Sequence, residues 1–316
     1  MAPKYWSMIR ARLLQVVPIV ILATLVVFGL LQLVPGDPAY TLAGEFPDPE
    51  LVERIRKLYA LDQPWYSRYG SWLWNAMGGN LSTSIHTREP VLDMLARAFP
   101  HTLLVVVYAL VLTTVAGVSF GVLAAAHHGR PIDSLITGVV SLGISMPNFW
   151  IAIILVSVLA IGLQLFPATG AVALAENPLQ AIRHATLPAL ALASSSIAEL
   201  TRQVRSAMVE FLGATHVRTL YAKGLPRHLV LWHHGLRNIA VTLLTVIGLQ
   251  FNRLLAATVI VESVFAFPGV GGAVIHAAIN KDFPVVQGVV FLLVLIVLAV
   301  NLAVDLLCVA VDPRIK

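Results

Sequence analysis

Apolar residues gather in long runs along this chain of 316 residues, and six runs are long enough to cross a lipid bilayer. An α-helix needs about 20 mostly apolar residues to span the hydrocarbon core. The predicted spans cover approximately residues 13–34, 102–126, 135–165, 187–208, 239–265 and 285–311, and the third is interrupted at Pro147-Asn148. The pattern predicts an all-α membrane protein with six transmembrane helices.

The first apolar run follows three basic residues, as the hydrophobic part of a secretory signal peptide would. It is longer than the usual 7–15 residues of such a segment, and Pro35-Gly36-Asp37-Pro38 stands where small residues would mark a cleavage site. We therefore interpret it as a retained first helix, with a cleaved signal peptide as the alternative.

The overall composition supports a membrane protein. Apolar residues make up 58% of the chain and charged residues 12%, with a mean hydropathy of +0.84. Soluble domains average about 45–50% apolar and about 25% charged residues. Too little charge remains to cover a water-soluble surface, so a soluble globule and a disordered chain are both excluded.

Basic residues are distributed unequally between the two sets of loops. Twelve of the 21 lysines and arginines lie in the termini and in the loops that share their side, against three acidic residues. The large loop 35–101, on the other side, has six basic and eight acidic residues. The positive-inside rule places both termini in the cytoplasm, and it explains the net charge of +5 without nucleic-acid binding.

This orientation divides the chain into four predicted regions. Residues 1–34 are the cytoplasmic N-terminus and first span, and residues 35–101 are an external loop. Residues 102–311 form a five-helix core that contains a cytoplasmic loop at 209–238, and residues 312–316 are a cytoplasmic C-terminus.

The external loop has the pattern of an amphipathic helix. Asp48-Pro49 is a typical helix start, and Leu51, Ile55 and Leu58 follow at helical spacing. A group of aromatic residues comes next, from Trp65 to Trp74. Such a segment suits the membrane–water interface, and a small external subdomain that packs on itself fits the pattern equally well.

Motifs of catalysis and of metal binding are missing from the sequence. There is no G-x-x-x-x-G-K-[ST] phosphate-binding loop and no H-E-x-x-H zinc motif. The histidine pairs 127–128 and 233–234 are adjacent, so they point apart on a helix and make poor joint metal ligands. We predict no catalytic residues, no metal site and no cofactor bound by this chain.

The cytoplasmic loop contains a predicted short helix. Thr215 can cap it, Gly224 supplies the residue after its end, and Pro226 follows two positions later. A new helical element begins near Arg227. A basic, partly apolar helix that projects from a membrane bundle suits a docking site for a soluble partner, and an ordinary loop with two helical turns is the alternative.

The residues of this loop resemble the EAA coupling motif of binding-protein-dependent ABC importers. The resemblance rests on the segment Arg218-Thr219-Leu220-Tyr221-Ala222-Lys223-Gly224-Leu225 and on His234-Gly235-Leu236-Arg237-Asn238. Its form is similar to the dipeptide, oligopeptide and nickel permease branch of these importers. The motifs at residues 35–38, 145–150, 261–265, 267–271, 283–288 and 312–314 also match that branch, in the same order along the chain.

The resemblance implies a type I ABC importer permease fold and a place in a larger assembly. The implied partners are a second homologous permease, two ABC ATPase subunits, membrane lipid, and an external substrate-binding protein or lipoprotein. ATP and Mg²⁺ would be used by the ATPase subunits, and the implied location is the bacterial inner membrane.

The resemblance also assigns roles to individual residues. Arg218 to Leu225 would form the helix that couples to the ATPases, with Arg227 and His228 at the rim of the contact. The translocation path would be lined by Ser145, Asn148, Gln250, Asn252 and Arg253. The Met146-Pro147 step is either a gate or a simple helix kink.

Arg253 departs from the family pattern, because small residues are usual at this position and its neighbour. A charge within a span should face a cavity or a partner. Either Arg253 lines the path, or it forms a structural ion pair with Glu199 or Asp305.

The implied function is ATP-driven import of di- or oligopeptides. Nickel, glutathione or haem import by the same machinery is the alternative within the family. A secondary transporter is the alternative outside it, although the chain lacks the internal repeat that such proteins show.

Overall fold

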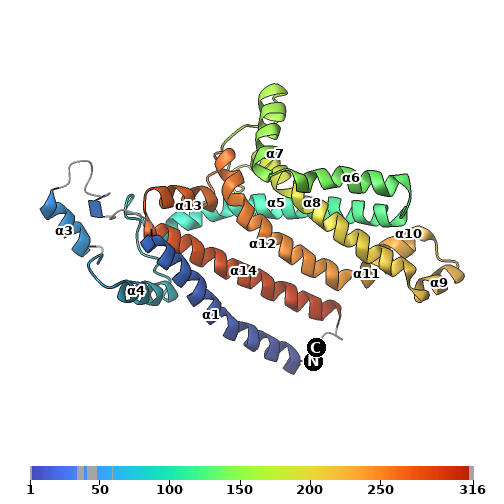
Figure 1. Cartoon of the computed structure of the whole chain (residues 1–316), viewed down its shortest axis with the longest axis horizontal. Helices are drawn as coiled ribbons and strands as arrows, with labels where there is room; N and C mark the ends of the chain where they lie inside the picture. Colours follow the sequence, from blue (N-terminus) through green and yellow to red (C-terminus); the bar gives the residue numbers. More distant parts are fainter. Residues whose placement is uncertain (1, 34–38, 41–47, 59, 313–316) are drawn as a thin grey trace. The chain divides into compact units, whose positions relative to one another are not determined.

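The computed structural model describes residues 2–33, 39–40, 48–58 and 60–312. Their helices are α1 (Ala2–Leu33), α3 (Pro49–Leu58), α4 (Trp65–Met77), α5 (Val91–Ala126), α6 (Pro131–Ser145), α7 (Asn148–Leu155), η1 (Val156–Gly162), α8 (Pro178–Gly213), α9 (Thr215–Ala222), α10 (Arg227–Leu229), η2 (Val230–Gly235), α11 (Leu236–Asn238), α12 (Ala240–Val264), α13 (Val270–Ile279) and α14 (Phe283–Val311) (Figure 1). The described residues contain no β-strand beyond one isolated bridge between Thr83 and Pro90. The motif at 35–38 and the C-terminal residues 313–316 lie outside the described residues.

The chain divides into two compact units that are not continuous in sequence. Unit 1 contains residues 1–100 and 269–299, and unit 2 contains residues 101–268 and 300–316. Helices α5 and α14 each contribute to both units.

Four described helices are long and apolar enough to cross a membrane: α1, α5, α12 and α14. Helices α6 and α7–η1 meet the same test together, with a bend of 98° between them, so they form either a broken span or a re-entrant loop. These elements confirm an all-α membrane fold. The interruption predicted at Pro147 is therefore much sharper than a kink within one crossing.

The predicted span 187–208 lies in α8, which is long but falls short of the others in apolar character. Three consecutive serines and Glu199 lower its hydropathy. Helix α8 packs on α6, α7 and α12 and buries 15 of its residues. A helix enclosed by protein does not need an apolar surface toward lipid, so its sequence can be more polar than that of a lipid-facing span.

Close contacts between α8 and its neighbours depend on small residues. A Cβ added at Gly121 of α5 would lie 2.6 Å from the Val204 Cβ and 2.9 Å from the Thr201 carbonyl oxygen, and one at Gly117 would lie 2.8 Å from the Leu200 Cβ. Gly117 and Gly121 are four residues apart, the spacing by which small residues let two membrane helices approach closely.

Unit 1 has its own hydrophobic core, in which the aromatic residues of α4 take part. Tyr69 and Trp72 are buried, and the Tyr69 hydroxyl lies 2.9 Å from the Ile21 carbonyl oxygen of α1, to which it donates. Trp72 packs edge-on against Phe291 of α14, with ring centroids 6.0 Å apart. These contacts pack α4 on the candidate membrane spans α1 and α14 rather than on the loop itself, while Trp65, Tyr66 and Trp74 remain exposed.

Helix α3 begins as the sequence predicts, because the Asp48 carboxylate accepts a hydrogen bond of 3.1 Å from the Glu50 amide. The apolar positions predicted for this helix were Leu51, Ile55 and Leu58, but the residue that it buries is another one. Val52 is 4% exposed, whereas Leu51 is 39% exposed.

Candidate functional site

The loop predicted to be cytoplasmic contains α9, a helix of eight residues that follows α8 after Ala214. Ala214 is the residue before its first turn, and no side chain caps it. The prediction of Thr215 as the cap was therefore wrong, because Thr215 already lies inside the helix. One face of α9 is anchored by Val217, which is 1% exposed and packs in the core cluster of unit 2.

The end of α9 forms a Schellman motif around Gly224. The Leu225 amide donates to the Leu220 carbonyl oxygen at 3.3 Å, and the Gly224 amide donates to the Tyr221 carbonyl oxygen at 2.9 Å. Gly224 has a φ of +80°, a left-handed conformation that glycine adopts without steric cost. Leu220 and Leu225 both pack against the unit 2 core, which is the apolar contact that accompanies this motif.

The predicted coupling residues divide into an exposed set and an anchoring pair. Leu220 and Leu225 are partly buried, as described above. The exposed residues are Arg218, Thr219, Tyr221, Ala222, Lys223, Gly224, Arg227 and His228. The helix thus offers two cations and an aromatic ring to solvent while two leucines hold it to the bundle.

Arg227 is also tied to its own chain. Its guanidinium donates to the carbonyl oxygen of Ala126, the last residue of α5. A cation at a helix C-terminus satisfies a free carbonyl and interacts favourably with the helix dipole. The contact connects the start of α10 to the end of α5.

An ion pair with a buried carboxylate lies near the same loops, and the sequence did not predict it. Arg205 of α8 holds Asp133 of α6 by two hydrogen bonds, Nε to Oδ1 at 2.6 Å and Nη2 to Oδ2 at 2.7 Å. Asp133 is 4% exposed, and the Gly129 amide also donates to it at 3.1 Å. The sequence offered one indication of this pair, because Asp133 is one of few acidic residues in the basic loops. Its partner lies 72 positions away and could not be predicted.

The structure brings two of the predicted path residues together at Glu199 of α8. The Gln250 carboxamide donates to Glu199 Oε2 at 2.9 Å, and Arg253 forms an ion pair with the same oxygen. Gln250 is 2% exposed, whereas the side chains of Arg253 and Glu199 are 59% and 27% exposed. Of the two partners considered for Arg253, the structure selects Glu199.

The other predicted path residues lie in separate contacts. The Ser195 hydroxyl of α8 donates to the Asn148 Oδ1 at 3.0 Å. Asn252 donates to Asn301 Oδ1 on α14 at 2.9 Å. Ser145, exposed at the end of α6, donates to the Ser141 carbonyl oxygen at 3.2 Å. Four of the five path residues thus contact other helices of unit 2, through three different partners.

Comparison with known proteins gives a family for the whole chain. Residues 117–316 match the family described as binding-protein-dependent transport system inner membrane component. Residues 6–106 match the N-terminal region of the corresponding membrane components. The chain belongs to this family. It is accordingly a multi-pass inner membrane protein that resembles the membrane subunits of binding-protein-dependent importers.

Relatives match this inner membrane component over nearly its full length. The dipeptide transport system permease protein DppB of Escherichia coli (strain K12) is 36% identical over 332 aligned residues, covering 98% of this chain and 98% of the relative. DppB of Alkalihalophilus pseudofirmus is 31% identical, covering 96% and 98%.

One solved structure has a similar fold. It is the MetNI methionine ABC transporter in inward-facing conformations, with a TM-score of 0.59 and 19% identity. The match covers 70% of this chain and 97% of the other. It supports the type I importer fold for the inner membrane component.

Proposed function

We propose that this protein is a channel-forming subunit of an ATP-driven importer of di- and oligopeptides. The observation that carries the proposal is the similarity to dipeptide permeases along the whole chain, 36% identity over 98% of both sequences in one case. Nickel, glutathione and haem remain the alternative substrates, and the experiment below compares them.

The proposed assembly contains partners that supply the energy and the substrate. A second homologous permease completes the channel, and two ABC ATPase subunits bind ATP and Mg²⁺ on the cytoplasmic side. An external binding protein or lipoprotein delivers the substrate. This chain binds no cofactor itself, and both of its termini lie in the cytoplasm, as its basic loops predict.

In the proposed mechanism, α9 transmits movement from the ATPases to the membrane helices. Arg218, Thr219, Tyr221, Ala222 and Lys223 form the contact face, with Arg227 and His228 beside it. Leu220 and Leu225 connect the helix to the core around α8. Closure of the ATPase pair would move α9 as a rigid body and shift the permeases between inward- and outward-facing states. Hydrolysis would reset them.

The polar residues Ser145, Asn148, Gln250, Asn252 and Arg253 are proposed to lie along the translocation path. Support comes from the exposure of Arg253 and Ser145 and from the intramembrane polar contacts of the other three. Polar side chains inside a membrane domain are costly and are commonly kept for such pathways.

The experiment is a substrate panel in bacterial cells from which only the gene for this chain has been deleted. Uptake of labelled dipeptides, tripeptides, nickel, glutathione and haem is compared with and without a plasmid copy of the gene. We expect peptide uptake to fall to background in the deletion and to return with the plasmid. Restoration of nickel, glutathione or haem uptake, with peptide uptake unchanged, would reject the peptide assignment.

A further inference from the structure

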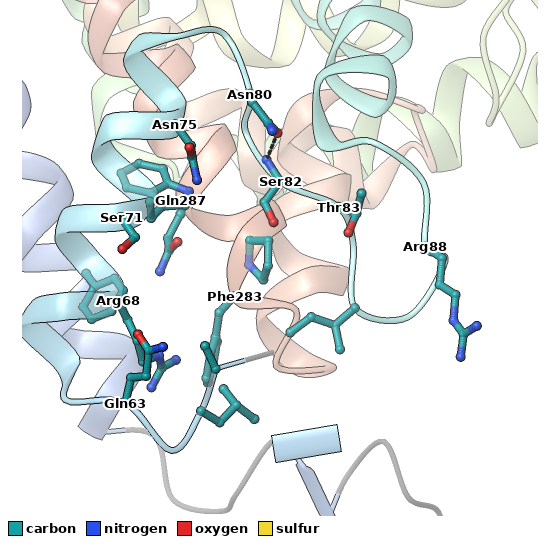
Figure 2. Close-up of a pocket in the computed structure, with 16 residues that line it drawn as sticks. Gln63, Arg68, Ser71, Asn75, Asn80, Ser82, Thr83, Arg88, Phe283 and Gln287 are labelled. Carbon is teal, nitrogen blue, oxygen red and sulfur yellow. Dashed lines mark hydrogen bonds between the residues drawn. The ribbon is translucent and has the colours of Figure 1, made fainter. Parts of the chain in front are cut away.

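Unit 1 contains a cavity of about 660 Å³ between α4, the segment 80–88 and the start of α14 (Figure 2). The volume lies within the range of small-molecule sites, about 300–1,000 Å³. Two of the lining side chains are arginines. The others are either apolar or polar without a charge. None of the roles assigned above uses this cavity.

Three elements place side chains around the cavity, and those of the two helices follow helical spacing. Arg68, Ser71, Trp72 and Asn75 follow one face of α4, and Phe283 and Gln287 are one turn apart on α14. The segment after α4 adds Asn80, Ser82, Thr83, Ile85 and Arg88. Figure 2 shows the labelled side chains of these elements around one common space.

The charge of the lining is positive. Arg68 and Arg88 line the cavity, and among the residues that the structure describes no aspartate or glutamate does. Neither guanidinium forms an ion pair within the described residues. Arg68 instead lies over the Phe28 ring, 5.8 Å from its centroid. Since no carboxylate of the described residues neutralises these cations, the cavity favours a negatively charged ligand.

One further donor in the lining is buried and has no partner within the described part of the chain. The indole N–H of Trp72 has no hydrogen-bond acceptor within the described part of the chain, although the residue is only 8% exposed. Gln287 also lines the cavity, and the residue as a whole is 6% exposed. Buried donors usually have partners, because an unmade hydrogen bond costs about 1–3 kcal/mol. A ligand with an acceptor oxygen would satisfy the indole N–H.

The backbone of the cavity wall is held in an uncommon conformation. Ala60, Ser82 and Arg88 all line the cavity, and their φ values are +50°, +70° and +58°. Non-glycine residues in the left-handed region cost free energy and cluster at ligand sites. The wall therefore has a defined shape that its sequence alone would not favour.

We propose that this cavity binds a small amphiphilic oxyanion. Arg68 would neutralise the carboxylate or phosphate group, and the Trp72 indole and the Gln287 carboxamide would donate hydrogen bonds to it. The apolar part of the ligand would lie against Phe283, Ile85 and Pro284. A short peptide with a free C-terminal carboxylate and a phospholipid with an anionic head group both carry this chemistry.

The test measures binding to the purified full-length chain by calorimetry in a non-ionic detergent. One arm compares N-acetyl-phenylalanyl-leucine with its C-terminal amide. The second compares a short-chain phosphatidylglycerol with the phosphatidylcholine of the same acyl length. We expect the anion of at least one arm to bind at least tenfold more tightly than its matched partner, and the arm that binds identifies the source of the ligand.

Variants locate the binding in the cavity. Arg68→Gln should lower the affinity for the preferred anion at least tenfold. Arg68→Lys, which keeps the charge, should retain part of that affinity. Arg54→Gln on α3, whose side chain is 72% exposed and which does not line the cavity, is the matched control and should bind normally. Overturning results are binding of neither anion, equal binding within both pairs, or normal binding by both Arg68 variants.

Discussion

At the scale of single residues, Glu199 connects two helices through its contacts with Gln250 and Arg253. Its carboxylate is about a quarter exposed, so water screens its charge only in part. Removal of the arginine leaves this charge without its cation, whereas removal of both charges leaves two neutral amides that can still interact. A partly buried pair broken on one side loses more stability than a pair replaced on both.

We therefore expect Arg253→Gln to lower the thermal midpoint of the purified protein more than the double variant Arg253→Gln/Glu199→Gln does. The expected coupling between the two sites is about 1 kcal/mol. Thermal unfolding of the parent, both single variants and the double variant measures it. Additive effects of the two single changes would show that the pair contributes nothing to stability.

Several of these residue-scale features could be predicted, and others could not. The role of Gly224 was predictable, because a glycine followed two positions later by proline is typical of a helix end at which the glycine adopts the left-handed conformation. Thr215 was misplaced by one position, since its hydroxyl suits a cap that Ala214 occupies. Glu199 was one of two partners considered for Arg253. The Arg205–Asp133 pair and the lining of the cavity depend on folding across long stretches of sequence, so no local pattern revealed them.

At the scale of elements, the approach of α5 to α8 depends on two glycines in α5. The backbone atoms of α8 lie so close to Gly121 that even one methyl group would overlap the Thr201 carbonyl. Gly138 of α6, by contrast, has nothing within 4 Å of an added Cβ. The two positions form a matched pair of helical glycines.

We expect Gly121→Ala to destabilise the protein by about 1–3 kcal/mol through overpacking. Gly138→Ala should be neutral or slightly stabilising, because alanine is the better helix former. Thermal unfolding in detergent compares the two variants with the parent. Equal changes in unfolding temperature for the two variants would show that α5 and α8 do not approach closely at Gly121.

The elements themselves were predictable to different degrees. Long apolar runs predicted α1, α5, α12 and α14, although α5 starts 11 residues before the predicted span at 102. At about 1.5 Å per residue, its 36 residues exceed the thickness of a bilayer core of about 30 Å. The position of the break at Pro147 follows from its missing amide donor and the restriction on Met146, but the angle of 98° is set by packing on α8.

At the scale of the whole molecule, the distribution of basic residues predicts which loops face the cytoplasm. Single cysteines at Thr215 and Asp62, both exposed, test this in a Cys308→Ser background. We expect an impermeant thiol reagent to label position 62 in intact cells and position 215 only after the membrane is opened. Labelling of 215 alone in intact cells would reverse the topology.

We propose above that ATPase subunits drive this chain through α9, and a substitution at Gly224 tests this coupling directly. Valine at a φ of +80° costs about 1–2 kcal/mol and should disturb the end of the helix. Gly213 lies at the other end of the same loop, has open space around it and has no positive φ, so Gly213→Val is the matched control.

The measurement is ATP-driven uptake of a labelled dipeptide into proteoliposomes that contain the assembled transporter, with the binding protein outside and ATP inside. We expect that the parent and Gly213→Val transport, and that Gly224→Val assembles and hydrolyses ATP but takes up at least fivefold less peptide per ATP. Normal uptake by Gly224→Val would show that α9 does not transmit the movement, and uptake by the parent driven by an ion gradient without ATP would show that ATP is not the energy source.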